Sequence, residues 1–250
     1  MPMTPKTEKD ILVIKDLCKS FGTLTVLDQF SLSLKYNQNV VVLGKSGSGK
    51  SVLIKCIIGL LKPDSGTIHV FDEQVQYVSE EKLDRLRVRI GFLFQSNALY
   101  DSMTVRENLE FPLRRHKRNQ SERTVEELVK QSLNDVGLIH TIDMMPEELS
   151  GGMRKRIALA RTLILKPEII LYDEPTTGLD PITSKEIIEL MNSIKIKYGT
   201  SALVISHDMN CIKHSGDMIA LLWEGKCHVF DNYQNLLKSK DPVVMKFFDT

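Results

Sequence analysis

The chain has 250 residues, 42% of them hydrophobic, which is enough for one domain with a substantial buried core. Its 33 basic and 32 acidic residues give a net charge of +1, which disfavours a nucleic-acid partner. The four cysteines form no C-x-x-C pair, so they suggest neither a zinc site nor a disulfide framework, and we expect a reducing compartment. We expect no signal peptide, and no segment has the roughly eighteen apolar residues that a membrane span requires.

The beginning of the chain predicts strands followed by a helix. Short apolar stretches up to residue 43 alternate with Gly, Asn and Asp, which is typical of a set of antiparallel strands. The last stretch, residues 40–43, is continuously apolar and predicts a strand buried on both faces. A helix pattern begins at Lys50 and is expected to stop at the turn at 62–66.

The rest of the chain predicts helices inserted into an α/β pattern. Residues 67–95 suggest two strands around a polar helical insert, and a polar-rich helical pattern runs from 104 to about 145. Strands and helices then alternate: a helix from about Gly152, a strand at 168–173, a helix after Pro181, a strand at 201–208 and a strand pair within 217–230. This alternation predicts a parallel sheet covered on both faces, with 96–150 as an inserted subdomain.

A phosphate-binding loop is indicated by GKSGSGKS, which matches G-x-x-x-x-G-K-[ST] and lies between an apolar strand and a helix. Its glycines allow backbone N–H groups to surround phosphate oxygens, its lysine adds a positive charge, and its last serine is suited to bind Mg²⁺. A Gly-rich turn without a ligand is the weaker alternative. The predicted ATP-binding residues here are Gly44, Lys45, Ser46, Gly47, Ser48, Gly49, Lys50, Ser51 and the adjoining Val52.

Two further apolar strands end in residues that suit phosphate chemistry. Asp173 and Glu174 follow the first of them, at the sheet edge where ligands of open α/β sheets bind. Asp173 is then placed to hold Mg²⁺, and Glu174 to polarise an attacking water. His207 follows the second strand and is expected to contact the γ-phosphate. Each feature alone would also fit a structural role.

A second phosphate-binding surface is predicted at SGGMRKR, where Ser150, Gly151 and Gly152 precede an apolar helical run. Free backbone N–H groups and the positive end of the helix dipole converge at such a helix start. The chain therefore carries two phosphate-binding surfaces, although one nucleotide needs only one.

The motifs, in this order, resemble those of the nucleotide-binding subunit of an ABC transporter over nearly the full chain. The phosphate-binding loop resembles the Walker A motif, and ILYDE resembles Walker B, with Glu174 as the catalytic base. Gln95 resembles the Q-loop glutamine, which implies catalytic and Mg²⁺-binding roles, and His207 resembles the switch histidine. LSGGM resembles the signature, Asp180 the end of the D-loop, and Phe21 the aromatic residue that stacks on adenine.

The resemblance implies an α/β P-loop NTPase fold with a mixed sheet core, an N-terminal antiparallel β subdomain and an inserted α-helical subdomain. Core and β subdomain would occupy about 10–95 and 151–235, the helical subdomain about 96–150, and a C-terminal tail 236–250. ATP and Mg²⁺ are the implied cofactors, and ATP hydrolysis coupled to transport is the implied reaction. Because two such chains meet head to tail in this family, SGG would bind the ATP of a homodimer partner.

Several details resemble the Mla-type phospholipid transport ATPases. The details are the amino-acid sequence of residues 96–114, Met153 in the signature, Tyr172 in Walker B and, in part, the tail DPVVMKFFDT. In ABC transporters the region that 96–114 resembles receives a helix of the membrane permease. This resemblance implies phospholipid or another hydrophobic compound as the cargo. It also implies a peripheral subunit at the cytoplasmic face of the inner membrane, with an integral-membrane permease and a periplasmic lipid-binding protein as partners.

Other functions stay open at this point. The ATPase of an ABC transporter does not touch the cargo, so the same chain could serve a permease for another solute. A soluble ABC scaffold of the iron–sulfur assembly type is a second alternative. Translation and DNA-repair ATPases need tandem cassettes or a long coiled-coil insertion, which 250 residues do not hold.

Two surface features have two readings each. The tail places Val243, Val244, Phe247 and Phe248 on one apolar stripe, which would pack on its own domain or hold a dimer partner. The basic run at 114–118 is expected to be a solvated helix end, with contact to anionic lipid headgroups as the alternative.

Overall fold

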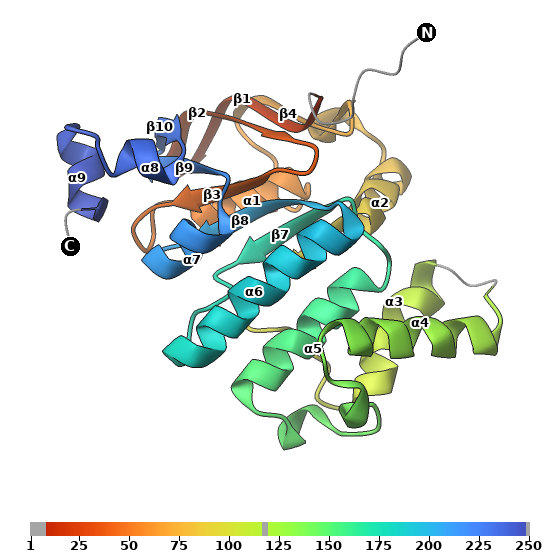
Figure 1. Cartoon of the computed structure of the whole chain (residues 1–250). Helices are drawn as coiled ribbons and strands as arrows, with labels where there is room; N and C mark the ends of the chain where they lie inside the picture. Colours follow the sequence, from red (N-terminus) through yellow and green to blue (C-terminus); the bar gives the residue numbers. More distant parts are fainter. Residues whose placement is uncertain (1–8, 117–119, 249–250) are drawn as a thin grey trace, which may run out of the picture.

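The computed structural model describes residues 9–116 and 120–248, which form two sheets and a group of helices (Figure 1). The smaller sheet is antiparallel, with the strand order β2-β1-β4-β5. Its strands are β1 (Asp10–Phe21), β2 (Leu24–Lys35), β4 (Ser65–Val70) and β5 (Glu73–Gln74). The antiparallel β subdomain that the sequence predicts is therefore present.

The larger sheet has the order β10-β9-β3-β8-β7-β6 and is parallel except at one edge, where β10 runs antiparallel to β9. The fold class predicted above, with a mixed sheet core, is confirmed. The strands are β3 (Asn39–Leu43), β6 (Ile90–Leu93), β7 (Ile169–Asp173), β8 (Ser201–Ser206), β9 (Met218–Trp223) and β10 (Lys226–Asp231).

The larger sheet separates two hydrophobic cores. Along β3, Val40 and Val42 face the core that contains α1 and the antiparallel sheet, whereas Val41 and Leu43 face the core that contains α6 and α7. Successive side chains of a strand point to opposite faces, so a continuously apolar strand can serve both cores. These helices are α1 (Lys50–Ile57), α6 (Pro181–Tyr198) and α7 (Met209–Ser215).

A third core lies among α3, α4 and α5, which Figure 1 shows on the side of the molecule away from β1 and β2. Helix α5 contributes to two cores, because Ile157 and Ala160 face α3 and α4 while Ala158 and Leu159 face the core beside the larger sheet. Helix α5 therefore connects the helical insert to the larger sheet. The helices are α3 (Val105–His116), α4 (Glu122–Asp135) and α5 (Gly151–Leu163).

The structure corrects several predicted elements. Strand 40–43 is not part of the antiparallel set but lies in the middle of the parallel sheet, because its two apolar faces require cover on both sides. The helix from Lys50 ends at Ile57, before the predicted turn. The helical pattern at 104–145 is divided into α3, α4 and a 3₁₀ turn at 139–141, and the polar insert forms α2 (Glu80–Arg89).

The C-terminal segment packs on its own chain. It forms α8 (Tyr233–Leu236) and α9 (Pro242–Phe248), and Val244 of α9 is buried in the core beside α6. The Phe247 ring meets Trp223 edge to face with the centroids 6.0 Å apart, and Phe248 lies beside Tyr233. The apolar stripe therefore packs on its own domain, which is the first of the two predicted positions. Its contact with a partner chain stays a prediction.

The basic run is described only in part. Arg114 forms an ion pair with Glu110 one helical turn earlier, as expected for a solvated helix end, whereas residues 117 and 118 lie outside the described residues. Within residues 9–116 and 120–248, no helix combines the length and apolar character that crossing a membrane requires.

Candidate active site

A cavity of about 400 Å³ lies at the carboxyl ends of the parallel strands. The segments after β3, β6, β7 and β8 supply its walls, and the end of β1 closes one side. Parallel strands all present this end at one edge of the sheet, which explains why distant segments meet here. The residues that line it are Phe21, Val26, Ser46, Gly47, Gly49, Lys50, Ser51, Val52, Gln95, Asp173, Glu174, Ile205 and His207.

The phosphate-binding loop depends on a glycine at the start of α1. Gly49 has φ 104°, and a Cβ atom there would lie 2.7 Å from Cγ1 of Val26 and 3.0 Å from its carbonyl oxygen. No side chain caps α1 and no acidic residue lies in its first turn, so its N-terminal N–H groups are left for an anion. Ser48 Oγ is buried without a hydrogen-bond partner among the described residues. This cradle fits the phosphates of a nucleotide.

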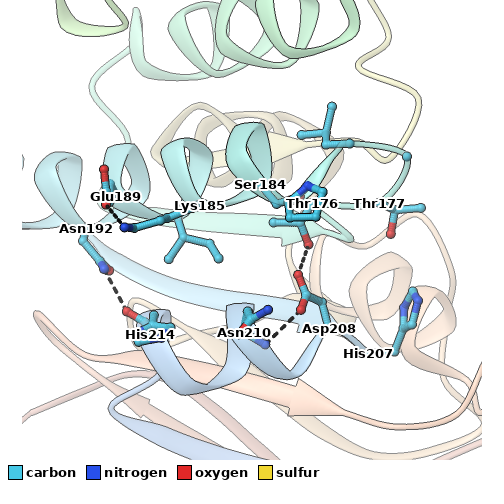
Figure 2. Close-up of a pocket in the computed structure, with 14 residues that line it drawn as sticks. Thr176, Thr177, Ser184, Lys185, Glu189, Asn192, His207, Asp208, Asn210 and His214 are labelled. Atoms are coloured by element: carbon cyan, nitrogen blue, oxygen red, sulfur yellow. Dashed lines mark hydrogen bonds and ion pairs between the residues drawn. The ribbon is translucent and has the colours of Figure 1, made fainter.

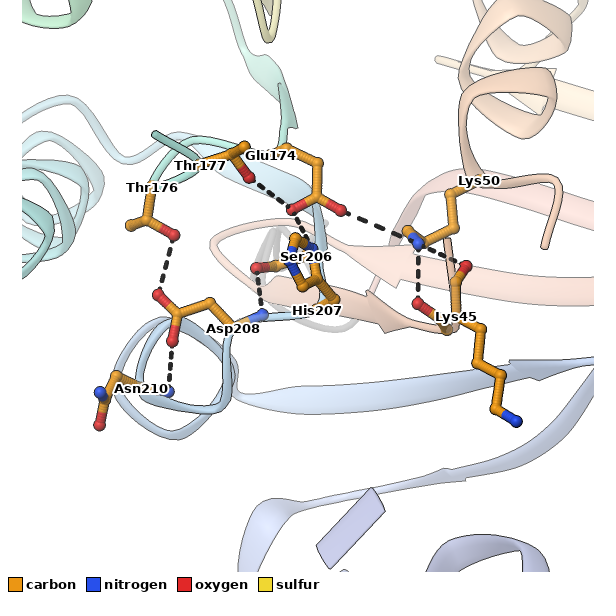
Figure 3. Close-up of polar contacts among 10 residues, drawn as sticks. Lys45, Lys50, Glu174, Thr176, Thr177, Ser206, His207, Asp208 and Asn210 are labelled. Atoms are coloured by element: carbon orange, nitrogen blue, oxygen red, sulfur yellow. Dashed lines mark hydrogen bonds and ion pairs between the residues drawn. The ribbon is translucent and has the colours of Figure 1, made fainter. Parts of the chain in front are cut away.

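Lys50 is folded into the loop that it belongs to. Its side chain is buried, and Nζ donates to the carbonyl oxygens of Gly44 at 2.7 Å and Lys45 at 2.9 Å. Nζ also lies 3.8 Å from Oε1 of Glu174 (Figure 3). Burial lowers the pKa of Lys50, while the carboxylates of Glu174 and Asp173 act in the opposite direction. A polyanion in the cavity would stabilise this amine further in its charged form.

The charge of the Asp173 carboxylate is destabilised by its surroundings. Burial, and next the neighbouring Glu174, raise the pKa of Asp173, although Lys50 and Lys155 oppose this rise. A divalent cation would relieve the repulsion. The cavity also presents the Ser51 hydroxyl and the Gln95 amide, and oxygen ligands of these kinds suit Mg²⁺. The residues therefore fit the metal that the sequence predicts.

Glu174 is held in an uncommon backbone conformation, with φ 50° and 8% exposure. Its Oε2 lies 2.8 Å from Nδ1 of His207 and accepts a hydrogen bond from Thr177 Oγ1 at 3.2 Å (Figure 3). The backbone N–H of Glu174 donates to the Ile205 carbonyl on β8, which fixes the turn after β7. This carboxylate is thus directed into the cavity between a lysine and a histidine.

A larger cavity of about 620 Å³ lies between α6 and α7 and shares His207 with the first (Figure 2). It contains neither the phosphate-binding loop nor the carboxylates at 173 and 174, so we place the chemistry in the smaller cavity. Asp208 lies between the two cavities: it accepts from Thr176 Oγ1 at 2.9 Å and caps α7 through the Asn210 N–H. These bonds fix the strand end that carries His207.

The SGG segment does not meet this cavity within one chain. Ser150 and Gly151 are exposed, and Ser150 Oγ caps its own helix by accepting from Met153 N–H at 3.2 Å. Gly152 is needed for packing, because a Cβ atom there would lie 2.6 Å from Thr183 of α6. The predicted residues that do not line the cavity are Gly44, Lys45, Ser48, Ser150, Gly151, Gly152 and Asp180.

Asp180 has a structural task at the start of α6. Its carboxylate accepts from the N–H groups of Ile182 and Thr183, both at 3.0 Å, and the Thr183 hydrogen bonds lower its pKa. The same residue therefore fixes the helix that packs against Gly152.

Sequence reasoning missed Lys155, Thr177 and the apolar walls Val26 and Ile205. Lys155 is 2% exposed, and its Nζ donates to the Gln95 carbonyl at 3.0 Å. Burial lowers its pKa, while Asp173 opposes that shift. The available signal was a lysine on the apolar face of the helix, since Ala158 and Leu159 follow it by three and four residues.

The comparisons with known proteins agree with this geometry. A family model described as "ABC transporter" matches residues 27–177. Protein TRIGALACTOSYLDIACYLGLYCEROL 3 of Arabidopsis thaliana chloroplasts is 38% identical over 97% of this chain and 74% of its own length. The probable ribonucleotide transport ATP-binding protein mkl of Mycobacterium leprae is 38% identical over 94% of this chain and 68% of its own. A solved dimer, a post-hydrolysis state of the ATP-binding cassette MJ0796 bound to ADP and Pi, is 30% identical, covers 88% of this chain and 98% of its own, and has a TM-score of 0.80.

Proposed function

Because the chain belongs to the ABC transporter family and is an ATPase that uses Mg²⁺, we propose that it is the motor subunit of a transporter for phospholipid or another hydrophobic compound. The observation that carries the motor mechanism is the 400 Å³ cavity, which gathers a phosphate-binding loop, two carboxylates and a histidine. The cargo rests on the relatives and on the sequence details given above.

Nucleotide binding begins at Phe21 and Lys50. Phe21 is 49% exposed at the rim of the cavity and offers a ring face to adenine. With nucleotide bound, the Lys50 amine would leave the carbonyls of its own loop and bind the β- and γ-phosphate oxygens, and Ser51, Gln95 and Asp173 would hold Mg²⁺. When bound, Mg²⁺ neutralises charge on the phosphate oxygens.

Glu174 acts as the general base in this proposal. Once Lys50 has turned toward phosphate, Oε2 of Glu174 stays bound to His207 and Thr177, and Oε1, which Lys50 faced, accepts the proton of the attacking water. His207 holds that carboxylate in place and contacts the γ-phosphate. The His207 side chain is 62% exposed, so it can change its position when the nucleotide and the partner subunit bind.

The signature segment supplies the other half of each site. Ser150, Gly151 and Gly152 lie outside the cavity of their own chain, so we propose that they bind the ATP of a second copy in a head-to-tail homodimer. The similar cassette MJ0796 was solved as a dimer, which supports this arrangement. ATP would then hold the two chains together, and hydrolysis would release them.

The identity of the cargo rests on the relatives of this chain. The Arabidopsis relative is named for trigalactosyldiacylglycerol, a galactolipid, which favours a lipid cargo. The M. leprae relative is named for probable ribonucleotide transport and favours a polar cargo, so a permease for another solute is the second candidate. Partners would be an integral-membrane permease and a periplasmic lipid-binding protein, with the chain at the cytoplasmic face of the inner membrane.

The test is to purify the tagged chain from detergent-solubilised membranes of its own host and to identify the co-purifying proteins and lipids by mass spectrometry. A multi-span permease that arrives with phospholipid and a lipid-binding partner is the expected result. A permease with a receptor for a polar solute would overturn the lipid cargo, and soluble partners alone would overturn the transporter assignment. An untagged strain processed in parallel controls for lipid that adheres to the resin.

A further inference from the structure

Lys155 is a buried cation on the signature helix that the mechanism above does not use. Its Nζ donates to the backbone carbonyl of Gln95 at 3.0 Å, and within residues 9–116 and 120–248 it forms no ion pair with a carboxylate. An ammonium group has three protons to donate, and burying one without a counter-ion costs free energy. An apolar side chain would pack on this face of α5 at less cost, so the amine is not explained by packing.

Other side chains of α5 also hold the segment that contains Gln95. Arg161 donates to the carbonyls of Ala98 at 2.8 Å and Asn97 at 3.2 Å. The single proton of Thr162 Oγ1 faces the Ala158 carbonyl of its own helix at 2.9 Å, and the Phe92 carbonyl lies 3.2 Å from the same oxygen. Asn97 and Ala98 have φ values of 63° and 51°, a conformation that needs support from its surroundings. Helix α5 therefore donates hydrogen bonds to three backbone carbonyls of residues 95–98 and contacts a fourth carbonyl at Phe92.

These contacts connect the two phosphate-binding surfaces of one chain. Lys155 lies five residues after Ser150, which is about 7.5 Å along a helix. The charge of Asp173 also acts on this amine. Through α5, the SGG segment is thus joined to Gln95 at the edge of the cavity.

We propose that Lys155 is a positioning residue that holds the Gln95 backbone so that its side chain can reach Mg²⁺, and that it makes residues 92–98 and α5 move as one unit. The inference rests on the proposed role of Gln95 as a metal ligand. Residues that orient a metal ligand typically change metal affinity by tenfold or more when they are removed.

The test measures ATP binding by calorimetry, with Mg²⁺ and with EDTA, on full-length chains that all carry E174Q to prevent turnover. The ratio of the two dissociation constants gives the gain in affinity that Mg²⁺ provides. We expect K155M to reduce this gain about tenfold and leave binding in EDTA within about twofold, and we expect K155R to restore the gain. R161M is the matched control: it also loosens the segment, but not at Gln95, and should reduce the gain by less than about twofold.

A normal gain in K155M would overturn the proposal, as would equal losses in K155M and R161M or a failure of K155R to restore the gain. Q95A separates this inference from the proposed function. If Q95A loses the gain and K155M keeps it, only the Lys155 inference fails; if Q95A keeps the gain, the metal-binding role of Gln95 fails and the inference with it.

A measurement on the wild-type chain covers the case in which K155M does not fold. Hydrogen exchange at residues 92–98 and in the first turns of α5 is followed before and after addition of Mg²⁺ with a non-hydrolysable ATP analogue. We expect protection to rise in both segments at the same analogue concentration. Protection at 92–98 alone would contradict a common unit.

Discussion

The two phosphate-binding surfaces of this chain start alike and differ in what surrounds them. Each places glycine at the start of a helix, α1 or α5. At α1 the helix has no side-chain cap and faces a cavity with Lys50 and two carboxylates. At α5 the Ser150 hydroxyl caps the helix, and the segment is exposed and lies outside the cavity. The first surface is a nearly complete site, and we propose that the second binds a nucleotide held by a partner chain.

The largest effect should come from the first surface. We expect E174Q to lower kcat by about 10³-fold, because a general base contributes roughly 10²–10⁴-fold. ATP should still bind, since the phosphate-binding loop is unchanged, and the chain should accumulate as a nucleotide-bound dimer. Phosphate release and light scattering measure the two outcomes. Brisk hydrolysis by E174Q would remove Glu174 from the role of base.

The second surface should be needed for turnover but not for binding. We expect S150E to lower hydrolysis by about 10²-fold, because its carboxylate repels the phosphates of the partner's ATP. ATP affinity of the monomer should stay within about twofold, which Trp223 can report, since this single tryptophan lies 5.0 Å from Nζ of Lys45.

S121E is the matched control for this prediction. Ser121 caps α4 in the same group of helices by accepting from Thr124 N–H, as Ser150 does for Met153. S121E should therefore leave hydrolysis nearly unchanged. Equal loss of binding and hydrolysis in S150E would mean that Ser150 is structural.

One glycine of each surface, Gly49 and Gly151, should differ in how much stability is lost on substitution by alanine. At Gly49, with φ 104° and Val26 at 2.7 Å from the added Cβ, alanine should cost about 2 kcal/mol of stability. At Gly151 the nearest atom to an added Cβ is 3.9 Å away, so alanine should change stability by less than about 0.5 kcal/mol. Urea unfolding measures both. A G49A chain as stable as wild type would mean that the loop relaxes without cost.

The smallest effect concerns the C-terminal helix beside the first surface. Trp223 lies between Lys45 and Lys246, each with Nζ 5.0 Å from the ring centroid, and it contacts Phe247. Deleting residues 241–250 removes the buried Val244 and uncovers this ring, which should cost about 1.5 kcal/mol and shift the tryptophan emission to the red. The mass without nucleotide should not change if the stripe serves only its own chain. Conversion of a nucleotide-free dimer to monomers would support the partner contact instead.

Much of the nucleotide site could be predicted from the sequence, because its chemistry is local. A phosphate-binding loop needs glycines, a lysine and a helix start in a fixed order, and all of them lie within one short stretch. The carboxylates and His207 directly follow apolar strands, and parallel strands end at a common edge. Roles at Gln95, Phe21 and Asp180 depended on family resemblance, since a lone Gln, Phe or Asp carries no local signal.

The sequence by itself determined the elements, the residues of the phosphate-binding loop and the carboxylates at the sheet edge. Only the tertiary structure decided that 40–43 is a central strand, that Lys155 is buried against the Gln95 carbonyl, and that the SGG segment lies outside its own chain's cavity. The physical reason is the separation along the sequence of the residues that interact. Backbone conformation and capping depend on neighbours along the chain, whereas strand order, burial of a charge and the distance between two helix starts depend on how distant segments pack.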